Sequence, residues 1–344
     1  MRIAYWLGSY GEITEAWRHA FSITPSKYKH LGEALSAVGH DVTNIGIGET
    51  IDPNAFDCLV VPCWTLLMSV PLESIGALPL VLYSDGVYLN IMESAHIART
   101  SLIFTTTQPR VEEYRSFLPD KPVVSVDYGI TRNIQQETVS PYTGDRPVAV
   151  YVGRLAVRTW TVLMDLASRL PNVDFWIGGF ATGSPMRGIT GDRLSEVRSK
   201  ANCYLISDVA GEHDAIARRF KSDIHGPVTY GAAGRFIKHA DISLGLGHGK
   251  PPRNLPDHYG LACKIYGYWM QGTPSLVEHF GVQSLSVYPW NGVVFDGSIN
   301  SAVKGIAKML DSKYDRKRIA KWATVTYSWE TVAERMTKHM EAIL

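Results

Sequence analysis

Short apolar segments alternate with amphipathic segments along most of the chain. The apolar segments have the length of buried strands, and the amphipathic ones carry apolar residues at helical spacing. Strands that alternate with helices in this way pair in parallel and are covered by helices on both faces. The pattern therefore predicts an α/β fold with doubly wound parallel sheets. The predicted strands lie at residues 2–7, 40–45, 58–62, 80–83, 102–105, 123–126, 148–153, 173–179, 204–206, 225–228, 240–247 and 275–277.

Capping residues mark several of the predicted helices. Thr24 and Pro25 are a helix cap and a first-turn residue, and Gly39 follows the last apolar position of the same segment. Two further helices are predicted near residues 160–170 and from residue 327 onward. Each has one apolar face, which predicts burial of that face against a sheet or another helix. The apolar positions are Tyr28, Leu31, Leu35 and Val38 in the first helix, Leu163, Leu166, Ala167 and Leu170 in the second, and Trp329, Val332, Met336 and Met340 in the third.

The alternation is interrupted once, at residues 134–146. This segment is polar, contains Pro141 and Gly144, and has no periodicity, all of which is typical of a linker. A chain of 344 residues is also longer than one hydrophobic core usually serves. The sequence therefore predicts two domains.

One cation is unusually placed, in the segment 257–277. Gly272 and Pro274 end a predicted helix ahead of a short strand that starts at Ser275. Lys264 would lie in the first turns of that helix, where a cation meets the positive end of the helix dipole. A bound anion removes this cost, so Lys264 and the helix amides are a candidate phosphate site. A solvated surface lysine is the alternative interpretation.

The segment Lys264-Ile-Tyr266-Gly267-Tyr, with Gly272-Thr-Pro after it, resembles the donor-site helix of nucleotide-sugar glycosyltransferases with the GT-B architecture. The segments Gly39-His-Asp-Val-Thr and Ser328-Trp-Glu are similar to the start and the end of that family, in the same order. The resemblance implies two Rossmann-like, doubly wound domains that face a cleft. It assigns residues 1–143 to the acceptor-side domain, residues 144–326 to the nucleotide-sugar domain, and residues 327–344 to a helix that crosses back to the first domain.

The resemblance also implies a donor site. In the family the lysine contacts the donor diphosphate, and a glutamate at the position of Gly267 holds the ribose, so the ribose contact has no assigned residue here. Gly153 and Arg154 are assigned to the diphosphate pocket, with Arg158 as the nearest second cation. Two ordinary surface arginines are the alternative interpretation. Paired glycines at a strand end allow close backbone approach to a ligand, although a plain turn is the alternative. The predicted donor site comprises Gly153, Arg154, Arg158, Gly178, Gly179, Lys264, Tyr266 and Gly267.

A carboxylate directly after a predicted strand is the candidate catalytic group. Asp85 is placed where it could accept the proton of an acceptor hydroxyl or stabilise developing positive charge. Its position is similar to that of an aspartate in the phage enzymes that glucosylate hydroxymethylcytosine in DNA. An Asp-Gly turn is the structural alternative. The other predicted acceptor-side residues are Gly8, Glu12, His96 and His248.

Composition narrows the class of protein. A hydrophobic content of 45% with a net charge of +1 is typical of a globular enzyme, and it argues against a strongly basic nucleic-acid binder. The four cysteines lack metal-ligand spacing and no Asp-x-Asp motif is evident, so we expect reduced thiols and no metal. Neither a signal peptide nor an apolar run long enough for a bilayer is visible. We therefore expect a cytoplasmic monomer without integral membrane association.

Taken together, these features favour a retaining hexosyltransferase that moves glucose from a UDP-sugar, with retention implied by the resemblance alone. The leading acceptor is 5-hydroxymethylcytosine in double-stranded phage DNA, because basic clusters near Arg218 and Lys317 would follow phosphates. Solvated helix faces are the alternative interpretation of each cluster. A cell-surface glycan or a lipid-linked acceptor is the alternative. A catalytically dead sugar-nucleotide-binding module is a further alternative, favoured by Gly267. A dinucleotide-dependent oxidoreductase is disfavoured, because no G-x-G-x-x-G follows the first strand.

Overall fold

The computed structural model describes residues 1–8, 23–84, 92–130, 144–153, 157–179, 195–197, 199–206, 230–247, 263–279 and 281–343. Four predicted site residues lie outside these ranges: Glu12, Asp85, Arg154 and His248. Most of the predicted linker, the predicted strand at 225–228 and the basic cluster near Arg218 also lie outside them.

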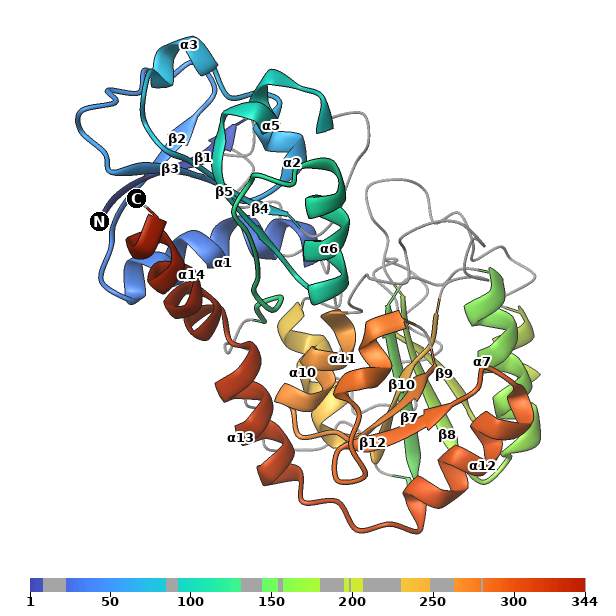
Figure 1. Cartoon of the computed structure of the whole chain (residues 1–344). Coiled ribbons are helices and arrows are strands. Elements are labelled where there is room, and N and C mark those ends of the chain that lie inside the picture. The colour runs from blue at the N-terminus through green and yellow to red at the C-terminus, as the bar shows by residue number, and fades with distance from the viewer. Residues whose placement is uncertain are drawn as a thin grey trace.

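Two six-stranded parallel sheets form the centre of the described structure, one in each half of the chain (Figure 1). The first has the strand order β2-β1-β3-β4-β5-β6, and the second has the order β12-β11-β10-β7-β8-β9. The first sheet contains β1 (Arg2–Gly8), β2 (Asp41–Gly46), β3 (Cys58–Val61), β4 (Leu80–Ser84), β5 (Thr100–Thr105) and β6 (Val123–Ser125). The second contains β7 (Val148–Gly153), β8 (Asp174–Gly179), β9 (Cys203–Ile206), β10 (Ile242–Gly245), β11 (Ser275–Glu278) and β12 (Gly292–Phe295).

Helices accompany both sheets, as the alternating pattern predicts. Leu31 and Leu35 of the first helix are buried, and so are Leu163, Leu166 and Ala167 of the second. The helices of the first half are α1 (Ile23–Ala37), α2 (Trp64–Leu67), α3 (Leu72–Ile75), α5 (Ala95–Arg99) and α6 (Gln108–Phe117). The later ones are α7 (Val157–Arg169), α10 (Tyr230–His239), α11 (Cys263–Met270), the 3₁₀ helix η3 (Gly281–Ser286), α12 (Ile299–Leu310), α13 (Arg316–Tyr327) and α14 (Trp329–Ile343).

Strand order locates the places where a ligand is expected. In an open parallel sheet, ligands bind beyond the carboxyl ends of the strands at the point where the strand order reverses. The first sheet reverses between β1 and β3, and the second between β7 and β10. Gly8 ends β1 and Gly153 ends β7, so two predicted site glycines lie at these two points.

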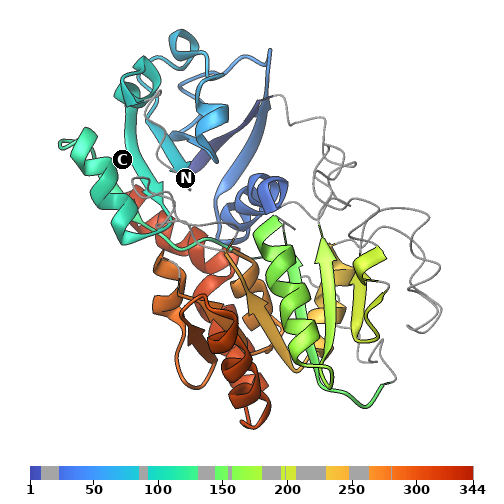
Figure 2. The same cartoon turned by 90° about the vertical axis from the view of Figure 1, so that its right-hand side faces the viewer.

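The C-terminal helices return the chain to the first sheet. In Figures 1 and 2, α13 runs beside the second half of the molecule, while α14 and both chain ends lie with the first half. Helix α14 contacts α1 and β5. The four apolar positions predicted for this helix, Trp329, Val332, Met336 and Met340, are all buried.

Three of the four cysteines, Cys58, Cys63 and Cys203, are buried and take part in no disulfide, and the burial agrees with the prediction of core thiols. Within the described ranges, no group of three or more His, Cys, Asp or Glu side chains is placed to hold a metal ion. Among the same residues, no helix combines the length and the apolarity that crossing a membrane requires.

Candidate anion site at the edge of the second sheet

Lys264 is the second residue of α11, and its side chain reaches back to the carboxyl edge of the second sheet. Its Nζ donates a hydrogen bond of 2.9 Å to the Leu246 carbonyl, just beyond β10. The same nitrogen lies 3.3 Å from Tyr151 Oη and 4.6 Å from the centroid of the Tyr151 ring. Lys264 is therefore not an ordinary solvated surface lysine. It lies at the reversal point between β7 and β10.

The surroundings of Lys264 change its protonation. Burial lowers the pKa of this lysine from 10.5 to about 7, and the negative charge of Glu278 opposes that shift. An anion placed against the ammonium would raise the pKa again, because it favours the charged form. The charge of Lys264 therefore depends on pH near neutrality.

Glycines occupy three neighbouring positions at the ends of β7 and β8, and the Lys264 side chain packs closely against one of them, Gly153. A Cβ added at Gly153 would lie 3.2 Å from Lys264 Cδ and 3.0 Å from Tyr151 Oη. Gly179 pairs with Gly153 in the sheet, and Gly178 pairs with Val152. The last paired residues of β7 and β8, Gly153 and Gly179, thus carry no side chain of their own, which favours close approach of other groups to the backbone.

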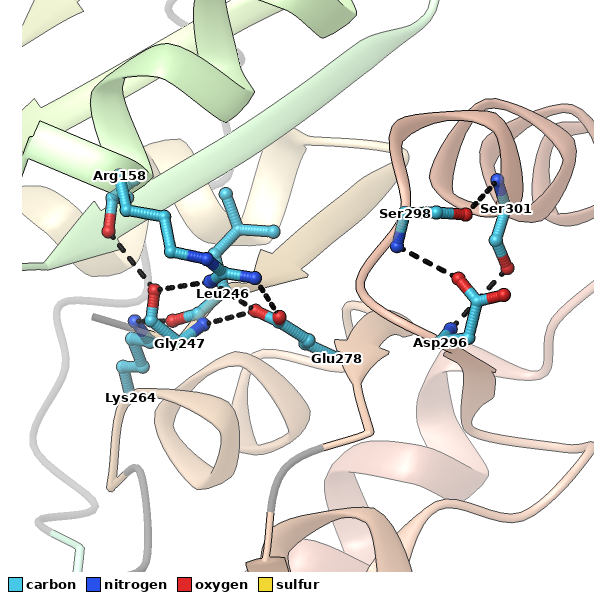
Figure 3. Close-up of polar contacts among 9 residues, drawn as sticks. Arg158, Leu246, Gly247, Lys264, Glu278, Asp296, Ser298 and Ser301 are labelled. Atoms are coloured by element: carbon cyan, nitrogen blue, oxygen red, sulfur yellow. Dashed lines mark hydrogen bonds and ion pairs between the residues drawn. The ribbon is translucent and has the colours of Figure 1, made fainter. Parts of the chain in front are cut away.

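Arg158, in the first turn of α7, forms an ion pair with Glu278 at the end of β11 (Figure 3). Its Nη1 lies 2.9 Å from Glu278 Oε2, and its Nη2 contacts Oε1. Nη1 also donates to the carbonyl of Gly247 over 3.2 Å. The bonds to Glu278 raise the pKa of Arg158. The role predicted for Arg158 as a donor ligand stays a prediction, because its observed contacts are with Glu278 and the Gly247 carbonyl.

Glu278 was not predicted from the sequence. Its carboxylate is buried and accepts the Gly247 backbone N–H at 2.8 Å as well as the arginine. The signal that could have indicated it is a charged residue at the end of an apolar strand, Ser275-Leu-Val-Glu278. A carboxylate at the carboxyl end of a central strand faces the ligand edge of the sheet.

Tyr268 is a second residue that the sequence did not single out. Its hydroxyl donates to the Val152 carbonyl at 2.9 Å and accepts from the Val152 N–H at 2.8 Å. Both backbone groups of one β7 residue are thus bound to α11. This pair of bonds joins α11, the helix that carries Lys264, to the strand that ends at Gly153.

The other two predicted donor residues of α11 lie in the interior. Tyr266 is buried and stacks on Tyr327 of α13, with ring centroids 4.0 Å apart. It also contacts Trp269 at 5.7 Å. Gly267 is buried in the middle of the helix. These contacts explain why an aromatic residue follows the lysine, and a role for either residue in donor binding stays a prediction.

On the first sheet, Gly8 and His96 both contact the segment that follows α2. Gly8 has a φ of +56°, and a Cβ there would lie 3.0 Å from Leu66 Cδ2 and 3.3 Å from Ser69 Oγ. His96 Nε2 donates to the Val70 carbonyl at 3.0 Å. The structure therefore brings the two predicted residues to one short segment. Their role toward an acceptor stays a prediction.

The fold is shared with solved glycosyltransferase structures over nearly the whole chain. Sucrose-phosphate synthase from Thermosynechococcus elongatus matches with a TM-score of 0.69 at 12% identity, covering 99% of both chains. AviGT4, a glycosyltransferase of avilamycin A biosynthesis, matches at 0.61 and 11% identity over 100% of this chain and 98% of that one. Anabaena HepE, solved in complex with UDP and glucose, matches at 0.62 and 12% identity over 99% and 100%. The prediction of an α/β fold of the GT-B type is confirmed.

No protein-family model and no curated protein matches the sequence. At 11–12% sequence identity, these matches show a similarity of fold.

Proposed function

We propose that this protein is a glycosyltransferase that moves a hexose, glucose in our proposal, from a UDP-sugar to an acceptor hydroxyl. The observation that carries the proposal is the position of Lys264. Its ammonium lies in the first turn of α11, at the reversal point of the second sheet and beside Gly153. A cation, helix-start amides and an open backbone edge are what a diphosphate requires. HepE, which shares the fold, was solved with UDP and glucose, and this supports UDP as the nucleotide.

Lys264 would act on the leaving group. When the glycosidic bond to the donor breaks, negative charge grows on the β-phosphate oxygen of UDP. A fixed ammonium stabilises that charge more strongly in the transition state than in the bound donor. Arg154 follows Gly153 directly and is proposed as the second cation. Transfer with retention of configuration is proposed from the resemblance of the motifs.

For the acceptor we propose 5-hydroxymethylcytosine in double-stranded DNA. Lys317, Arg318 and Lys321 are exposed on α13, which supports contact with a phosphate backbone. Arg316 has a different task, because it donates to the Ala240 carbonyl at 2.7 Å and to Thr273 Oγ1 at 2.8 Å. The 5-hydroxymethyl group lies in the major groove, where a bound protein can reach it. A cell-surface glycan or lipid-linked acceptor is the other possible outcome of the test.

The test is to incubate the protein with a panel of UDP-sugars and DNA that contains 5-hydroxymethylcytosine. Mass spectrometry of the digested nucleosides is expected to show one added hexose when UDP-glucose is present. DNA without the hydroxymethyl group is the control. Release of UDP without transfer to DNA would support the glycosyltransferase activity and exclude DNA as the acceptor. UDP binding with neither transfer nor hydrolysis would indicate a catalytically dead scaffold.

Asp85 is the proposed catalytic carboxylate, and Asp85→Asn removes its charge with little change in size. We expect turnover to fall by roughly a hundredfold or more, because general-base assistance contributes on this scale. UDP binding, measured by calorimetry, should be unchanged, since the nucleotide is proposed to bind the other domain. Glu93→Gln is the control, because Glu93 is an exposed carboxylate in the same connection between β4 and β5. Turnover of the Asp85 variant at the wild-type rate would remove Asp85 from the mechanism.

A further inference from the structure

Lys264 and Glu278 bind opposite ends of one peptide group. Lys264 Nζ donates to the carbonyl oxygen of Leu246, and Glu278 accepts the N–H of Gly247, the next residue. These two groups belong to a single planar unit, so the position of one end fixes the other. The arrangement is a continuous chain from ammonium to carbonyl, then to N–H and carboxylate (Figure 3).

We propose that Glu278 is a positioning residue of the anion site, which orients and charges Lys264 through the Leu246–Gly247 peptide without touching the ligand itself. The identity of the anion rests on the proposed function. The hydrogen-bond geometry does not depend on that function, because these bonds join only residues of this protein.

The ion pair between Arg158 and Glu278 holds this series of hydrogen bonds in place. A buried carboxylate is costly to keep charged unless its oxygens are fully paired. Glu278 has the Gly247 N–H and both terminal nitrogens of Arg158 as donors. Arg158 Nη1 and Thr159 Oγ1 also donate to the Gly247 carbonyl, at 3.2 and 3.3 Å. The next peptide is therefore held too, so the Leu246 carbonyl has little freedom to turn away from Lys264.

Among the described residues, the titratable groups near Lys264 come from four elements. Tyr151 of β7 and Tyr268 of α11 are neutral in the physiological range, because burial raises the pKa of both phenols. Glu278 of β11 is the carboxylate that favours the charged form of Lys264. Arg158 of α7 opposes this effect of Glu278, because Arg158 is a cation paired with the same carboxylate. Removing Glu278 and removing Arg158 should therefore move the titration of Lys264 in opposite directions.

The experiment follows the Lys264 side chain directly by NMR, in protein labelled with ¹³C at lysine Cε. The signal is assigned by its loss in Lys264→Arg. In the wild type it should titrate near pH 7. Glu278→Gln keeps an oxygen that can accept the Gly247 N–H but removes the charge, and should lower the midpoint by roughly one pH unit. Arg158→Met should raise it, because Glu278 then acts on Lys264 without a competing cation.

Asp296→Asn is the matched control. Asp296 lies at the same end of the sheet, but its carboxylate accepts from Ser298 N at 2.8 Å within its own loop (Figure 3). Its removal should leave the Lys264 midpoint in place. General loosening of the fold would shift both test variants the same way, so opposite shifts separate positioning from simple destabilisation. If Glu278→Gln does not fold, the upward shift in Arg158→Met decides the question alone.

Equal midpoints in the wild type and the variants, or shifts of the same sign, would overturn the inference.

Inorganic pyrophosphate then tests the proposed function separately. If the midpoints shift as expected but neither pyrophosphate nor UDP binds, the positioning role stands and the donor site is wrong. If pyrophosphate binds while the midpoints do not move, the donor site stands and Glu278 has no part in it.

Discussion

Replacing Lys264 by methionine is expected to weaken UDP binding by roughly 1.5–3 kcal/mol, the range for a lost hydrogen bond to a charged group. Methionine keeps an unbranched apolar stem beside Gly153 and Tyr151, so packing is nearly retained. The ammonium and its bond to the Leu246 carbonyl are lost. Calorimetric titration with UDP measures the effect.

The same substitution should stabilise the fold at pH 7. The pKa of Lys264 is about 7 in the folded protein, against the ordinary value of 10.5. Between these values the unfolded chain binds more protons, so the free energy of unfolding rises as the pH rises from 7 toward 10. At pH 7 most of that stability is absent. Removing the amine should therefore raise the free energy of unfolding by on the order of 2 kcal/mol, after allowance for the lost hydrogen bond.

Urea unfolding at pH 7 and pH 9.5 tests this. The wild type should gain more stability between the two values than Lys264→Met does, since the variant lacks the titrating group. UDP affinity should also fall above pH 7 in the wild type alone, because deprotonation removes the cation. Lys308→Met, at an exposed position of α12, is the control and should change neither quantity. A variant that binds UDP as tightly as the wild type would refute the assignment of Lys264 to the donor site.

The strands could be predicted because the sheets are parallel and covered on both faces. Such strands are apolar at successive positions, and β3 and β7 are buried along their full length. The short strand β12 was not predicted. Its Val294 is exposed, so its apolar run carries little of the burial signal.

The candidate site was only partly accessible to sequence reasoning. The end of the helix that carries Lys264 could be predicted from Gly272, which has a φ of +76°. Lys264 is the second residue of that helix, in agreement with its predicted place in the first turns. The pairing of Arg158 with Glu278 joins residues 120 positions apart and depends on the order of the strands, which local patterns do not determine. Tyr266 was assigned to the donor from its motif, whereas its observed contacts are with Tyr327 and Trp269.

Trp329 is one of several residues through which the C-terminal helix packs against the first half of the molecule. Its ring lies 5.3 Å from that of Tyr128 and 6.1 Å from that of Tyr83. The backbone beside it is also joined, because Ile130 N donates to the Tyr327 carbonyl at 2.7 Å. This junction lies where the chain passes from the second sheet back to the first, so its integrity should control how the two halves are held together.

Gly129→Ala is expected to lower the free energy of unfolding by roughly 3 kcal/mol, as an overpacking substitution against a rigid ring. A Cβ at this position would overlap the indole of Trp329, which is buried and has little space to move. Gly46→Ala is the matched control, since the nearest atom to its added Cβ is 3.6 Å away, and it should cost little. In a Trp329→Leu background the Gly129 substitution should cost much less, because the overlapping ring is gone. An equal cost in both backgrounds would show that the close approach of Gly129 to Trp329 does not hold this junction.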